Sequence, residues 1–163
     1  QTLAQMIAAG EIDALHTARA PSTFYNRPTD VKRLFENYVE VERAYFRKTR
    51  IFPIMHVIAI RREMYEANPW IAQSLYKAFV QSQRHTYQDL SETAALKGML
   101  PWLTAHVEDA RREMGDDWCS YGLASNRHVR DTFLRYHHEQ GLSKKRLKPE
   151  DLFARETLEA FKI

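Results

Sequence analysis

Cysteine and long apolar runs are both scarce in this sequence. One cysteine, Cys119, is present among 163 residues, so the chain alone can form no disulfide and no zinc site built from several thiolates. No uninterrupted apolar stretch approaches the roughly 18 residues that a membrane-spanning helix needs. We therefore expect neither a disulfide-stabilised domain nor a membrane protein.

Several familiar catalytic motifs are absent as well. The sequence contains no HExxH, GxGxxG, P-loop or GxSxG pattern. These absences remove the main support for a zinc peptidase, a dinucleotide- or nucleotide-binding enzyme and a serine hydrolase. No cofactor and no resident metal are predicted.

The composition is that of a folded, ordinary-sized domain. The chain is 44% hydrophobic and 28% charged, with a net charge of +3. This balance excludes extensive disorder and favours anionic partners only weakly. The basic cluster Lys144-Lys145-Arg146 lacks interleaved aromatic residues, so we interpret it as a solvated face and expect no nucleic-acid partner.

Two segments have the pattern of β-strands. Residues 12–17 follow a short helix over 2–9 and its terminal Gly10, and they lead into a loop at 18–23 that contains Pro21. Residues 51–60 are apolar on both faces apart from one histidine, as in a central strand covered on both sides. The predicted fold class is therefore a helix-rich α/β protein.

Helical periodicity accounts for most of the remaining chain. Residues 30–49 are amphipathic, and a helix is expected to begin at Asn68-Pro69 and run to about Leu90. Further helices are expected after Pro101, ending at Gly115, from Ser125 or Asn126 to Gly141, and in one or two short pieces of the tail. Two strands alone do not make a stable sheet, so the missing strands must come from a partner segment or a larger protein.

Four residues are candidates for chemistry. Arg19 and Ser22 lie in the loop after the first predicted strand, where a guanidinium and a hydroxyl can hold a carboxylate. His56 interrupts the second predicted strand, and His16 lies near the end of the first. The alternatives are a surface arginine, a hydrogen-bonded core histidine, and a metal site in which a carboxylate joins His16 and His56.

Motifs along nearly the whole chain resemble, in order, those of the 4,5-dihydroxyphthalate decarboxylase family. They are Gly10-Glu11-Ile12-Asp13-Ala14, Ala18-Arg19-Ala20-Pro21, Ile51-Phe52-Pro53-Ile54-Met55-His56, Asn68-Pro69-Trp70, Leu100-Pro101-Trp102, Met114-Gly115-Asp116-Asp117, Tyr121-Gly122 and His138-Glu139-Gln140-Gly141-Leu142. The family is similar in fold to type II periplasmic solute-binding proteins, with two α/β lobes around a cleft. The resemblance implies that this chain is the C-terminal half, with about 1–50 ending the second lobe and crossing over, and about 51–163 returning to the first lobe.

The resemblance also implies an activity, which is removal of one carboxylate of 4,5-dihydroxyphthalate as CO2 to give protocatechuate. Arg19 and Ser22 would then bind a substrate carboxylate. His56 would be the main proton-transfer residue, and His16 would be the second choice, for transfer of the other proton in the reaction. The expected partner is a small aromatic carboxylate, and exposed strand edges would favour a homo-oligomer.

Two alternatives remain open at this stage. One is a solute-binding protein of a transporter for an aromatic or heterocyclic acid, and the other is a half-length interaction protein that dimerises to complete its sheet. A secretory signal before Gln1 would favour the binding protein, whereas its absence would favour a cytoplasmic enzyme, which is the localisation we predict.

Overall fold

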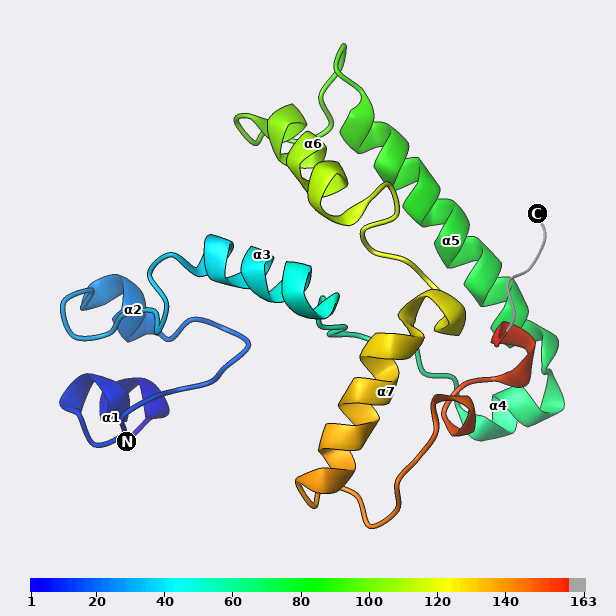
Figure 1. Ribbon diagram of the computed structural model, residues 1–163, viewed down its shortest axis with the longest axis horizontal. Helices are drawn as coiled ribbons and strands as arrows, with labels where there is room; N and C mark the ends of the chain where they lie inside the picture. The colour runs from blue at the N-terminus through cyan, green and yellow to red at the C-terminus, as the bar shows by residue number, and fades with distance from the viewer. Residues whose placement is uncertain (159–163) are drawn as a thin grey trace. The chain divides into compact units, whose positions relative to one another are not determined.

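The computed structural model describes residues 1–158, and the chain divides into two compact units, Gln1–Thr49 and the residues from Arg50 onward. Each unit is described by itself. Within residues 1–158 all the regular secondary structure is helical (Figure 1).

The first unit contains three helices, α1 (Leu3–Ala9), α2 (Ser22–Asn26) and α3 (Tyr38–Thr49), and α1 contacts α2. The ends of α1 follow from its sequence. The Thr2 hydroxyl accepts a hydrogen bond from the Gln5 amide while the Gln5 side chain accepts one from the Thr2 amide, which forms a capping box. Gly10 ends the helix in the left-handed region at φ 73°, where glycine has no steric cost. The predicted helix over 2–9 is therefore confirmed.

The second unit is built around α5 (Trp70–Ser91), the longest helix of the described chain. Helix α4 (Arg62–Ala67), helix α6 (Leu103–Met114) and the 3₁₀ turn η2 (Arg155–Thr157) all contact α5 (Figure 1). Helix α7 (Leu123–Glu139) contacts the 3₁₀ turn η1 (Pro149–Asp151). The helices predicted from about 69 to 90, from 101 to 115 and before Gly141 are thus confirmed, as are short helical pieces in the tail.

The apolar core of both units is small. Val31 is the buried apolar residue of the first unit within the described chain, and the second unit buries Ala72, Val107, Leu123 and Leu134. Many large apolar side chains are exposed instead, among them those of the segment 51–60. Since apolar burial is the main favourable term in folding, each unit by itself has little to stabilise it.

The two predicted strands are the main error of the sequence analysis. Residues 12–17 and 51–60 form no β-ladder in the structure, and the α/β class is therefore not supported by residues 1–158. A strand is stabilised by hydrogen bonds to a neighbouring strand, and neither segment has such a neighbour among the described residues. The second segment lies open, with Met55 77% and Val57 60% exposed, although its sequence is that of a buried strand.

Smaller differences affect the helices. The amphipathic pattern of 30–49 is helical only from Tyr38, because Pro28 and the turns that follow it occupy the preceding residues. Helices α2 and α4 were not predicted, since five or six residues are too few to show helical periodicity.

Candidate functional site

Three of the four predicted site residues belong to the first unit. His16 and Arg19 lie in the irregular segment between α1 and α2 and are exposed, and Ser22 is the first residue of α2. The Arg19 amide donates a long hydrogen bond of 3.4 Å to the Thr17 hydroxyl. The Arg19 guanidinium forms no ion pair with the described residues, so its donors are available to an anion.

His56 belongs to the second unit, where it lies exposed in the extended segment 51–60. Within residues 1–158 the His56 side chain is therefore not buried, and its role stays a prediction. The convergence of His56 with His16 stays a prediction, because the two residues belong to different units.

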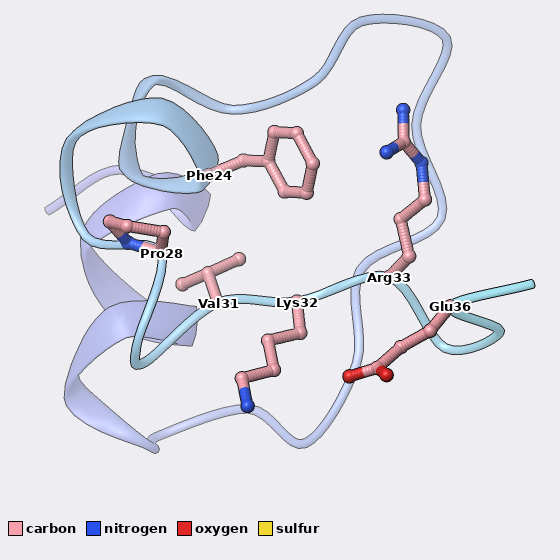
Figure 2. A pocket seen from close by; sticks show the side chains of 6 residues that line it. All are labelled: Phe24, Pro28, Val31, Lys32, Arg33 and Glu36. Atoms are coloured by element: carbon pink, nitrogen blue, oxygen red, sulfur yellow. The ribbon is translucent and has the colours of Figure 1, made fainter.

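A cleft of about 350 Å³ opens in the first unit, just beyond the predicted carboxylate loop (Figure 2). It is lined by Phe24, Pro28, Val31, Lys32, Arg33 and Glu36. In Figure 2 the Phe24 ring points from α2 toward the Arg33 side chain, and Pro28 and Val31 lie beside it. The Arg33 guanidinium lies 5.0 Å from the centroid of the Phe24 ring and 4.7 Å from that of Tyr38.

The charged side chains that line this cleft are unpaired among the described residues, whereas charged side chains elsewhere in the same unit form ion pairs. Arg27 pairs with Asp30 at 2.7 Å, and Arg43 approaches Glu40 at 3.9 Å, both in the same unit. Lys32, Arg33 and Glu36 form no ion pair with any described residue. The cleft therefore carries two cations and one anion without partners, which leaves it with an excess positive charge.

The sequence does not predict this cleft, because the amphipathic pattern of residues 30–49 indicates one continuous helix. The signals that could have revealed it are Pro28, which interrupts helical pattern, and the adjacent cations Lys32-Arg33 close to an aromatic residue.

A second cluster of polar groups lies in the second unit, between α5 and the loop 115–122. The Tyr87 hydroxyl oxygen accepts hydrogen bonds from the Cys119 amide at 3.0 Å and from the Gln83 side-chain amide at 3.2 Å. The same hydroxyl donates a long hydrogen bond of 3.4 Å to a carboxylate oxygen of Asp117. The Tyr87 ring lies against Trp118, 4.3 Å between centroids. Together these contacts fasten the loop to α5.

Burial raises the pKa of the Tyr87 phenol to about 12, from an ordinary value of 10.0, and the negative charge of Asp117 adds to the rise. The Cys119 thiol lies beside the same carboxylate, and burial together with Asp117 raises its pKa as well. A thiol whose pKa is raised is a poor nucleophile at neutral pH. We therefore assign this cluster a structural role.

The Tyr87 phenol predicts a loss of stability at alkaline pH. Its pKa is higher in the folded protein than in the unfolded chain, so its contribution is complete below pH 10.0 and is lost as the pH rises toward about 12. Urea denaturation at stepped pH values measures this loss as a falling free energy of unfolding. Tyr87→Phe is expected to be less stable at neutral pH, because it loses the Cys119 hydrogen bond, but to fall less steeply above pH 10.0. Parallel curves for the two proteins would contradict the assignment.

Across residues 1–158, no three histidine, cysteine, aspartate or glutamate side chains lie close enough together to hold a metal ion. In the same part of the chain, no helix combines the length and apolarity that crossing a bilayer requires.

Comparison with known proteins finds similarity to a curated decarboxylase. The chain is 41% identical over all 163 of its residues to a 4,5-dihydroxyphthalate decarboxylase from Comamonas testosteroni. The match covers 49% of that protein, so the chain spans about half the length of the curated relative. No protein-family model matches the chain. The similarity extends over the whole chain, in agreement with the resemblance of the motifs to the 4,5-dihydroxyphthalate decarboxylase family.

Proposed function

We propose that the full-length protein is a carboxy-lyase that acts on 4,5-dihydroxyphthalate or a related aromatic carboxylate. The observation that carries the proposal is the 41% identity over all 163 residues. The products are CO2 and protocatechuate, and the proposed site of action is the cytoplasm.

The chemistry of this substrate needs few catalytic groups. Each carboxyl-bearing ring carbon lies para to a hydroxyl, so removing the phenolic proton raises electron density at that carbon. Protonation of the carbon gives a dienone, and breaking the bond to the carboxylate then releases CO2 and restores the aromatic ring. The enzyme must supply a base for the phenol, an acid for the ring carbon and cations for two carboxylates.

Residues of this chain are available for each task. Arg19 is our proposed carboxylate ligand, and its exposed guanidinium has no carboxylate partner among the described residues. Ser22, at the start of α2, assists it. His56 is the proposed proton donor to the ring carbon, and His16 takes the phenolic proton, because imidazole titrates near neutral pH.

We propose in addition that the full-length protein has two α/β lobes. What supports this is the segment 51–60, in which the side chains of Phe52, Met55 and Val57 are exposed although the sequence has the pattern of a central strand. An exposed apolar run of this kind gains stability when a neighbouring strand covers it.

The proposed activity is tested by incubating the full-length protein with 4,5-dihydroxyphthalate, with and without a chelator. CO2 release and the absorbance of the product are followed together. Turnover that survives chelation is the expected result. Turnover that a chelator abolishes would retain the reaction but contradict our expectation that no metal is needed. Saturable binding without turnover would contradict the enzyme activity and favour the alternative, a solute-binding protein with the same fold.

A further inference from the structure

We propose that Arg33 is a carboxylate-binding residue, and that the cleft around it receives the ring of a small aromatic carboxylate. The identity of the ligand rests on the proposed function, whereas the cleft and its charge are features of the first unit alone. A benzene dicarboxylate needs two cations, and Arg33 would supply one of them.

Two aromatic rings lie near the guanidinium of Arg33, whose side chain is exposed to solvent. The group lies over the ring of Phe24 at 5.0 Å and over that of Tyr38 at 4.7 Å. A guanidinium that contacts aromatic rings rather than a carboxylate keeps its N–H donors available. Those donors match the two oxygens of a carboxylate in bidentate geometry.

No protein carboxylate uses these donors. Arg33 forms no ion pair with the described residues, whereas Arg27, six positions earlier, is paired with Asp30 at 2.7 Å. Contact with two aromatic rings restricts the exposed Arg33 side chain, and such restriction lowers the entropic cost of binding an anion.

The apolar part of the cleft lies beside this cation. Pro28 and Val31 line it together with Phe24, and Val31 is only 6% exposed (Figure 2). The cleft has a volume of about 350 Å³ and is open to solvent, and the Lys32, Arg33 and Glu36 side chains that line it are exposed. Lys32 adds a second positive charge, and Glu36 offers an acceptor for a ring hydroxyl.

Phthalate is the probe that tests this proposal, because it has both carboxylates but no para hydroxyl and so cannot follow the proposed reaction. Its dissociation constant is measured by calorimetry with the full-length protein and its variants. Arg33→Gln is expected to weaken binding by about 10- to 100-fold, the usual effect of losing hydrogen bonds to a charged group. Arg33→Lys should recover only part of the loss, because an ammonium lacks the planar fork.

Arg27→Gln is the matched control, since it removes the same charge from the same unit at a residue outside the cleft lining. It should change phthalate binding less than twofold. The proposed role of the cleft would be contradicted if Arg33→Gln bound phthalate as tightly as the wild type does, or if the wild type did not bind phthalate. Neither result would bear on the proposed decarboxylation, which is measured separately as CO2 release. Phthalate binding that depends on Arg33, without any turnover of 4,5-dihydroxyphthalate, would support the binding role of the cleft and contradict the proposed function.

Discussion

His56→Gln is expected to lower kcat for 4,5-dihydroxyphthalate by about 100- to 10,000-fold, the usual contribution of a positioned general acid or base. Glutamine has about the size and polarity of histidine but does not titrate, so it retains hydrogen bonding and removes proton transfer. His56 is exposed in the second unit, and its replacement removes no buried contact there. CO2 release under saturating substrate gives kcat directly, and phthalate binding reports whether the site is otherwise preserved.

The matched control for this experiment is His106→Gln, at an exposed histidine of α6. It should leave kcat within about twofold, the behaviour of a surface substitution away from the site. A loss of less than tenfold for His56→Gln would contradict a role in proton transfer. His16→Gln, measured in parallel, separates the two proposed proton carriers: if it alone produces the large loss, the roles assigned to the two histidines are wrong.

The elements that the sequence predicted well are those determined by local interactions. The capping box and the terminal Gly10 of helix α1 lie within ten residues of each other in the sequence. Helix α5 begins after Pro69 and carries a long apolar stripe. Helix α6 ends at Gly115 for the same local reason. Helical hydrogen bonds join residues close in sequence, so such patterns carry most of the information that is needed.

The elements that were predicted wrongly depend on distant partners. The segment 51–60 has the composition of a strand, but a strand forms only beside another, and no neighbour exists within residues 1–158. The cleft was missed for a different, local reason: residues 27–37 are irregular rather than helical, and this brings Arg33 to the rings of Phe24 and Tyr38. The carboxylate loop with Arg19 and Ser22 was located from Pro21 alone, and its chemistry remains a prediction.

The second large effect is expected at Gly122, which joins the loop 115–122 to α7. Its φ of 94° is a conformation that other residues adopt only with strain. In addition, a Cβ atom placed there would lie 2.2 Å from the Tyr76 hydroxyl oxygen and 3.2 Å from Cζ of the same ring. Gly122→Ala should therefore lower the free energy of unfolding by more than about 3 kcal/mol, since strain and overlap add.

Gly115→Ala separates these two causes, because Gly115 has nearly the same φ, 93°, and nothing within 4 Å of the added Cβ. That variant should lose only the strain component, about 1 to 3 kcal/mol by urea denaturation. Tyr76→Phe removes the oxygen at 2.2 Å, so Gly122→Ala should cost less in the Tyr76→Phe background than in the wild type. If Gly122→Ala and Gly115→Ala cost the same in the wild type, and the Tyr76→Phe background changes neither, then the close packing of α5 against this loop does not determine why glycine is required at position 122.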